Sequence, residues 1–176
     1  MNKETYLHMT GILRDNPSRT KIASGTNSVI TKSIYFAYPC LLIWIFITNE
    51  GLSNPVNALL CSHFLKALLV PLASFVIVSV FRDKLNAPRP YEVFQTPPII
   101  PKNTKGHSFP SRHVFSIFVI AITFLACAGS PLWGIAIICM GILLATLRVI
   151  TGVHWPKDVI AGMVIGILCG SIEFLL

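Results

Sequence analysis

Long apolar segments constrain this chain more than any other feature of its sequence. Five of them follow a polar N-terminal part, at residues 33–48, 57–81, 110–128, 131–149 and 155–176. Each is close to the roughly 20 apolar residues that an α-helix needs to cross a bilayer. The runs are unbroken, which excludes the alternating strands of a membrane barrel. Charged residues make up only 12% of the chain, about half the fraction typical of soluble domains. The sequence therefore predicts an all-α integral membrane bundle of about five transmembrane helices.

The N-terminal part has a different composition. Residues 1–28 are polar and contain turn-forming residues in "RDNPSR" and "SGTNS". We interpret residues 1–28 as a polar tail that can include a surface helix, and residues 29–176 as the transmembrane domain.

Polar clusters mark four of the predicted helix ends. They lie at the end of the second apolar segment, the start of the third, the end of the fourth and the start of the fifth. If each segment crosses the membrane once, all four ends lie on one face. That face then collects most of the basic residues: Arg82, Lys84, Arg89, Lys102, Lys105, Arg112, Arg148 and Lys157. Single lysines of this kind are usually interfacial anchors, but so many cations grouped with histidines predict an anion site, for which arginine is well suited.

The stretch "TGVHWPKD" places His154 and Asp158 four residues apart. On a helix this spacing brings two side chains to one face. A carboxylate beside one imidazole nitrogen fixes the tautomer and supports positive charge on the ring, which frees the other nitrogen as a nucleophile or base. Taken alone, such a pair is as readily explained by helix capping.

Three short motifs carry a family resemblance. The chain has "RDKLNAPRP" at residues 82–90, "PSRH" at 110–113 and "LRVITGVHWPKD" at 147–158. In their order and spacing they resemble the motifs K-x6-R-P, P-S-G-H and S-R-x5-H-x3-D of the type 2 phosphatidic acid phosphatase (PAP2) superfamily. The resemblance covers about residues 55–176.

The resemblance implies a role for each matching residue. His154 would be the nucleophile that forms a phosphohistidine, Asp158 would orient it, and His113 would protonate the leaving oxygen and then activate water. The phosphate oxygens would be held by the remaining motif residues: Arg82, Arg89, Ser111, Arg112 and Arg148. Phosphoryl transfer depends mainly on positioning and charge stabilisation, which clustered arginines can supply.

The chain departs from the family motifs at three positions. Arg82 stands in place of the usual lysine and keeps the charge. Arg112 replaces the glycine of the second motif, where the backbone N–H survives beside a bulky cation. Leu147 replaces a serine, which removes one polar contact.

No cofactor and no metal are expected. His107, His113 and His154 together suggest zinc, but zinc sites need three or four converging ligands, and the surrounding arginines would repel a cation. His107 is interpreted as a loop residue near the mouth of the site.

The leading hypothesis is a metal-independent lipid phosphatase acting on phosphatidylglycerophosphate, phosphatidic acid or undecaprenyl diphosphate. A lipid phosphotransferase using the same phosphohistidine and a non-catalytic lipid-binding or transport protein are the alternatives. The expected partners are the lipid phosphate and membrane lipids, without nucleic acid, and the oligomeric state is left open.

The chain is expected in the inner or plasma membrane as a multi-pass protein. The resemblance implies an extracytoplasmic active site. The positive-inside tendency points the other way, because the tail and the active-site loop carry nearly all the Lys and Arg residues.

Overall fold

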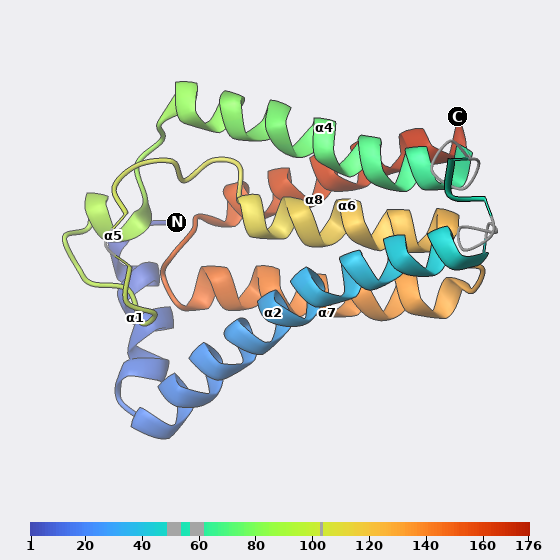
Figure 1. Ribbon diagram of the computed structural model, residues 1–176. Coiled ribbons are helices and arrows are strands. Elements are labelled where there is room, and N and C mark those ends of the chain that lie inside the picture. The colour runs from blue at the N-terminus through green and yellow to red at the C-terminus, as the bar shows by residue number, and fades with distance from the viewer. Residues whose placement is uncertain (49–53, 57–61, 103) are drawn as a thin grey trace.

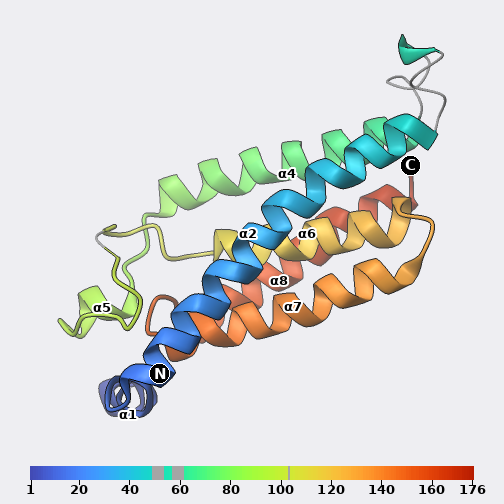
Figure 2. The same ribbon diagram turned by 60° about the horizontal axis from the view of Figure 1, so that its bottom comes forward.

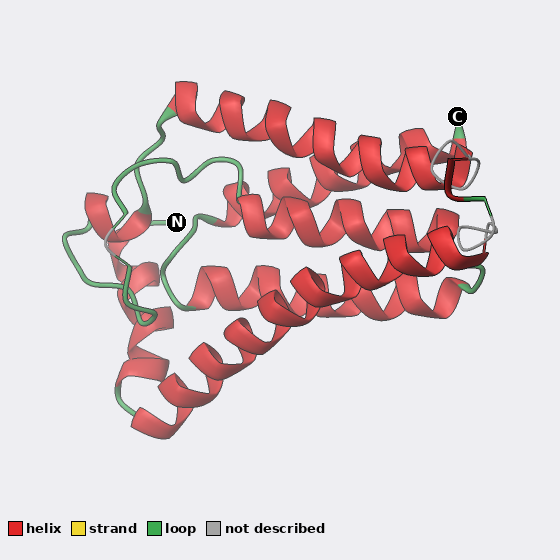
Figure 3. Cartoon of the chain, in the orientation of Figure 1, coloured by secondary structure: helices red, strands yellow, loops and turns green. Residues whose placement is uncertain are grey.

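Helices make up the whole regular structure of the part described here, which is residues 1–48, 54–56, 62–102 and 104–176 of a computed structural model (Figure 3). The elements in chain order are α1 (Lys3–Arg14), α2 (Pro17–Thr48), α4 (Ser62–Leu85), α5 (Pro90–Val93), α6 (Arg112–Cys127), α7 (Pro131–Ile150), α8 (Pro156–Ser171) and a 3-10 turn η1 (Ile172–Phe174). The predicted all-α membrane bundle is confirmed. The start of the predicted second segment, residues 57–61, lies outside the described residues.

Among the described residues, three helices are long and apolar enough to cross a membrane: Pro17–Thr48, His63–Val93 and Pro131–Ile150. Helices α6 and α8, with 16 residues each, are shorter. Helix α6 is largely buried within the bundle, whereas α8 packs one face against it and exposes Ile160 and Leu168 on the other. The outward faces of the longer helices expose large apolar side chains such as Phe36, Ile77 and Leu132. Such surfaces suit a hydrocarbon environment, where helices satisfy their own backbone groups.

Glycines set the distance between α6 and α8. Gly162, Gly166 and Gly170 recur every four residues along α8 and face α6. A Cβ on Gly162 would lie 2.7 Å from the carbonyl oxygen of Ser111, and a Cβ on Gly166 would lie 2.7 Å from that of Phe115. Small residues at this spacing let membrane helices pack with their backbones nearly touching. The N-terminal ends of α6 and α8 are thereby held side by side (Figure 1).

The first long helix begins earlier than the hydropathy indicates. The predicted segment 33–48 is the second half of α2, which starts at Pro17 after Asn16 accepts hydrogen bonds from the N–H groups of Ser18 and Arg19. The extra turns are amphipathic, so they bury Ala23 and Ile30 while their polar side chains hide the apolar signal. Residues 3–14 form the separate helix α1, which crosses one end of the bundle (Figure 2).

Candidate active site

One end of the bundle gathers the polar motifs. The C-terminal ends of α4 and α7, the N-terminal ends of α6 and α8, and the short helices α1 and α5 all lie there (Figure 1). The predicted convergence of four helix ends is therefore observed. The N-terminus of α6 adds free backbone N–H groups, which favour anions.

A tight turn between α7 and α8 positions His154. Gly152 adopts φ +74°, a conformation that suits glycine. The N–H groups of Val153 and His154 both donate to the carbonyl oxygen of Arg148, at 3.2 and 3.1 Å. These bonds fold the chain back on the end of α7, and His154 is 1% exposed.

Helix capping brings Asp158 to His154. Trp155 is the N-cap of α8 and Pro156 is its first residue, so Asp158 occupies the third helical position. Its Oδ2 accepts a hydrogen bond from the Trp155 N–H at 3.0 Å, and the same oxygen lies 3.4 Å from His154 Nδ1. The two side chains do meet, but the expectation of a shared helix face is wrong because His154 precedes the helix. The capping interaction and the pairing with His154 use one carboxylate.

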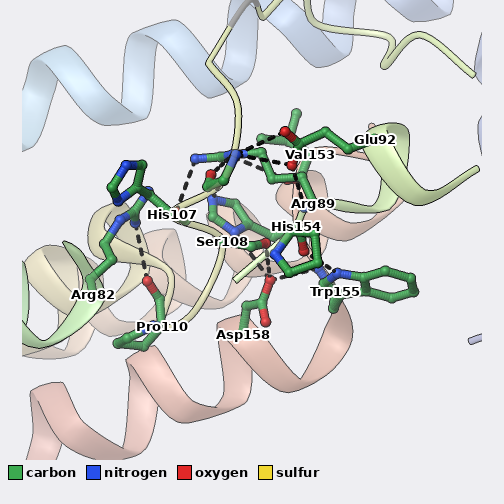
Figure 4. Close-up of polar contacts among 12 residues, drawn as sticks. Arg82, Arg89, Glu92, His107, Ser108, Pro110, Val153, His154, Trp155 and Asp158 are labelled. Atoms are coloured by element: carbon green, nitrogen blue, oxygen red, sulfur yellow. Dashed lines mark hydrogen bonds and ion pairs between the residues drawn. The ribbon is translucent and has the colours of Figure 1, made fainter. Parts of the chain in front are cut away.

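Ser108 completes the surroundings of this carboxylate, and sequence reasoning missed it. Its Oγ donates a short hydrogen bond to Asp158 Oδ2, and both side chains are fully buried (Figure 4). The backbone of Ser111 also donates to the carbonyl oxygen of Asp158 at 2.9 Å. The loop before α6 is thus tied to the first turn of α8. No local signal distinguishes Ser108, because its partner lies fifty residues along the chain.

Arg89 connects the two loops that flank His154. It is 1% exposed, and its guanidinium donates to the carbonyl oxygens of Gly106 (2.9 Å), His107 (3.2 Å) and Val153 (3.2 Å). Its Nη1 also lies 3.5 Å from His154 Nε2 (Figure 4). A guanidinium has five N–H groups, so the three carbonyl bonds leave two for His154 and an incoming phosphate.

Glu92 holds the backbone around Arg89. Its carboxylate accepts hydrogen bonds from the N–H groups of Arg89 (2.7 Å) and Gly106 (2.8 Å). These bonds cap α5 and fasten the loop that precedes α6 to it.

Other buried donors at this end lack a partner. The Oγ of Ser111 and the Nε of Arg148 have no hydrogen-bond partner among the described residues, although these side chains are 0% and 4% exposed. Buried polar groups are almost always satisfied, and an exception needs an explanation. An oxyanion ligand supplies one. Arg82, which is also buried, donates from Nη1 to the carbonyl oxygen of Pro110 at 3.1 Å.

The side chains of Arg112 and His113, in the first turn of α6, point in different directions. His113 is partly buried and lines a small cavity with Tyr35 of α2 and Ser116 of α6. The exposed Arg112 extends its guanidinium over the ring of Phe75, 5.6 Å from the ring centre. The side chain of Arg112 is therefore directed toward Phe75 of α4.

Burial determines the charge state of His154. Desolvation lowers its pKa, and the neighbouring Arg89 and Arg148 lower it further, while Asp158 partly opposes them. The ring is therefore neutral at rest. Because Nδ1 faces the carboxylate, we place the proton on Nδ1, which leaves the lone pair on Nε2.

Helix α1 packs against the turn that carries His154, which the sequence did not indicate. Tyr6 is fully buried and donates to the carbonyl oxygen of Thr96 at 3.1 Å. A Cβ on Gly152 would lie 2.6 Å from the Tyr6 hydroxyl. The rings of Tyr6 and Phe94 are 5.1 Å apart, and those of Phe94 and Trp155 are 5.4 Å apart. These tilted and edge-to-face ring contacts run from α1 to Trp155, the residue next to His154.

The described residues contain no group of three or more His, Cys, Asp or Glu side chains that could hold a metal ion. His107, the third histidine that sequence reasoning weighed, lies 3.1 Å from the exposed carboxylate of Asp83.

Comparison with known proteins identifies the family. The model of the PAP2 superfamily matches residues 63–176, well over half of the chain. The chain belongs to the PAP2 superfamily. The resemblance drawn from the three motifs is confirmed, and the chain is a multi-pass membrane protein of this family.

Curated relatives include two undecaprenyl-diphosphatases. The protein from Sulfolobus acidocaldarius is 31% identical over 133 residues, which are 70% of this chain and 64% of that protein. The match thus covers slightly less than two thirds of the length of the Sulfolobus protein. Undecaprenyl-diphosphatase BcrC from Bacillus subtilis is 26% identical over 174 residues, which are 99% of this chain and 83% of the relative.

Two crystal structures share the fold. Aquifex aeolicus LpxE superimposes with a TM-score of 0.71 at 23% identity, over 99% of this chain and 95% of LpxE. A PAP2-type phosphatidylglycerolphosphate phosphatase from Bacillus subtilis gives 0.71 at 19% identity, over 98% and 82%. At these identities the likeness establishes the fold alone.

Proposed function

We propose that this chain is a metal-independent membrane lipid phosphatase that works through a phosphohistidine on His154. The observation that carries the proposal is the buried His154 ring, with Nδ1 facing Asp158 and Nε2 next to Arg89. The unpartnered donors of Ser111 and Arg148 lie at the same end and would receive the phosphate oxygens.

The geometry suggests two chemical steps. In the first, His154 Nε2 forms a bond to phosphorus while the bond from phosphorus to the leaving oxygen breaks. Burial first and Arg148 second lower the pKa of His113, so it takes up a proton together with the incoming phosphate anion and gives that proton to the leaving oxygen. Asp158 supports the positive charge that develops on the His154 ring. In the second, His113 takes a proton from water as the water oxygen attacks phosphorus. The bond from phosphorus to nitrogen then breaks, which releases phosphate and restores neutral His154.

The arginines supply charge stabilisation in both steps. Phosphoryl transfer places negative charge on the equatorial oxygens, and fixed cations stabilise it most in a site that excludes water. Arg89 is held by three backbone carbonyls, so little reorganisation is needed when the phosphate arrives. Arg82, Arg148 and the first turn of α6 complete the proposed cradle.

We infer that the substrate is an isoprenoid or glycerolipid phosphate whose apolar part stays in the membrane. The names of the curated relatives favour undecaprenyl diphosphate, and phosphatidylglycerophosphate and phosphatidic acid are the other candidates. We also propose that the site faces the extracytoplasmic side, in line with the family resemblance and against the charge bias of the tail.

The test is phosphate release from a panel of lipid phosphates by detergent-purified protein in EDTA. Wild-type protein should release phosphate, and His154→Ala should lose release by about 10³-fold or more. His107→Ala is the matched control, because this histidine lies in the neighbouring loop and pairs with the exposed Asp83. It should retain activity. Acid-labile phosphate on quenched wild-type protein, absent from His154→Ala, would support the intermediate.

Three outcomes would contradict the proposal. Activity that EDTA abolishes would require a metal. Equal activity of His154→Ala and wild type would remove the nucleophile. Phosphate transfer to an added alcohol, without release to water, would favour the phosphotransferase.

A further inference from the structure

The proposed chemistry determines where the hydrocarbon part of the substrate begins. In the proposed first step His113 protonates the leaving oxygen, and a proton donor acts from hydrogen-bond distance, about 2.6–3.2 Å. In a lipid monophosphate this oxygen is bonded to the first carbon of the chain, and in a diphosphate the chain starts one phosphate further on. The hydrocarbon chain therefore leaves the site past His113.

The surroundings of His113 provide an apolar way into the membrane. Three buried side chains line a small cavity, the near cavity, together with His113: Ile34 of α2, Ile117 of α6 and Leu144 of α7. Tyr35 lines the same cavity and is exposed on α2, so the near cavity reaches the lipid-facing surface. The structure thus places apolar walls where the chemistry places the start of the hydrocarbon chain.

A larger hollow, the far hollow, follows along the same three helices. Helix α2 packs against both α6 and α7 (Figure 1), and the far hollow lies between α2, the C-terminal end of α6 and the N-terminal end of α7. Its volume is about 530 Å³, within the range of pockets that enclose small ligands. Every residue that lines it is apolar: Phe36, Ala37, Cys40, Leu41, Trp44, Phe124, Ala128 and Trp133.

The two hollows together cross most of the membrane. Phe124 and Ala128 of the far hollow lie about 16 Å and about 22 Å beyond His113 along α6. Trp44 and Trp133 are exposed at the same end, where aromatic side chains are typical of a membrane interface. One leaflet accounts for about half of a hydrocarbon core of about 30 Å. An acyl chain confined to its own leaflet therefore ends near the start of the far hollow, whereas a longer isoprenoid chain fills it.

We propose that the near cavity and the far hollow bind the hydrocarbon chain of the substrate, and that the far hollow favours isoprenoid chains longer than one leaflet is deep. The inference rests on the proposed function and deepens it by assigning chain selectivity to α2. This helix ends before residue 63, where the match to the family model begins, so the three motifs do not include it. Packing against fixed side chains, rather than transfer from water, provides the preference over bulk lipid.

The kinetic test fills the far hollow and compares two chain lengths. Cys40 lines the hollow with an exposed side chain, so Cys40→Trp adds a large ring there without disturbing the buried core. The ratio of kcat/KM for undecaprenyl diphosphate over geranyl diphosphate, measured in mixed micelles, should fall about 3- to 10-fold, because only packing contacts are lost. Geranyl diphosphate should be hydrolysed at the wild-type rate, which shows that the variant is folded.

Cys139→Trp is the matched control. Cys139 is an exposed cysteine of α7 that lines neither the near cavity nor the far hollow, so the same substitution should leave the ratio at the wild-type value. An unchanged ratio in Cys40→Trp, or an equal fall in both variants, would overturn the inference.

A labelling experiment separates this inference from the proposed function. His154→Ala protein in phosphatidylcholine vesicles is irradiated with a long-chain isoprenyl phosphonate that carries a diazirine at the far end of its chain. Label should appear on the far-hollow segments of α2 and α7, and undecaprenyl phosphate should displace it, even if the wild type proves inactive. Label spread evenly over the lipid-facing helices, or undiminished by undecaprenyl phosphate, would show ordinary membrane lipid in the hollow. That result would overturn the inference and leave the proposed chemistry intact.

Discussion

Replacing Gly162 by alanine should separate the two halves of the active site. The added Cβ would lie 2.7 Å from the carbonyl oxygen of Ser111 and 3.2 Å from the N–H nitrogen of Phe115. Both contacts are with backbone, so no side chain can rotate away. Ordinary contact begins near 3.4 Å, and α8 must therefore move from α6 by about 0.7 Å at this point.

This movement acts on the chemistry because the two helices carry different parts of it. Ser111 and His113 belong to the start of α6, whereas Asp158 belongs to α8. The hydrogen bond from the Ser111 N–H to the Asp158 carbonyl oxygen is 2.9 Å long and would stretch. A misplacement of about 1 Å can cost about 100-fold in rate, so we expect kcat to fall about 10- to 100-fold. Overpacking should also lower the free energy of unfolding by about 1–3 kcal/mol.

Gly170→Ala is the matched control. It lies on the same stripe, about 12 Å further along α8, and its Cβ would meet the side chain of Ile122 at 2.6 Å. We expect a similar drop in the thermal unfolding midpoint in detergent, with kcat reduced by no more than about 3-fold. The reasoning is refuted if Gly162→Ala keeps wild-type kcat, or if Gly170→Ala loses as much kcat at equal stability.

Three further predictions concern the surroundings of the nucleophile. Asp158→Asn should lower kcat by about 10³-fold, because an amide cannot support the charged ring. Ser108→Ala should lower kcat by about 10-fold. Equal rates for the two variants in single-turnover assays would contradict this order. Tyr6→Phe should keep kcat near the wild-type value. Tyr6→Ala should lower kcat and should also lower the free energy of unfolding by about 3–5 kcal/mol. A wild-type kcat in Tyr6→Ala would show that α1 does not support the turn. Because burial lowers the folded-state pKa of His154, the unfolded chain takes up the proton first as the pH falls below about 6.5. The stability that this pKa shift contributes is therefore fully present above that pH and is lost below it. The thermal unfolding midpoint should drop between pH 7 and 5, and it should drop by less in His154→Gln. An identical drop in the variant would argue against a neutral buried ring.

The sequence by itself determined the class of fold and supplied the members of the proposed catalytic set. Long apolar runs permit only helices in a membrane, and this local property needs no knowledge of neighbours. The polar clusters at alternate helix ends placed Arg82, His113, Arg148 and His154 at one end because crossing a bilayer leaves few topologies. The resemblance to the family motifs then suggested their roles.

The tertiary structure alone decided how these residues are held. The pairing of His154 with Asp158 comes from the cap of α8 and not from a helix face. Ser108 reaches Asp158, and Tyr6 reaches Gly152, across separations that no periodic pattern records. Hydropathy did not predict the amphipathic start of α2, because its apolar face is defined only by the helices that cover it. Such contacts depend on which surfaces meet after the bundle has packed, and the sequence specifies those surfaces collectively rather than in any one segment.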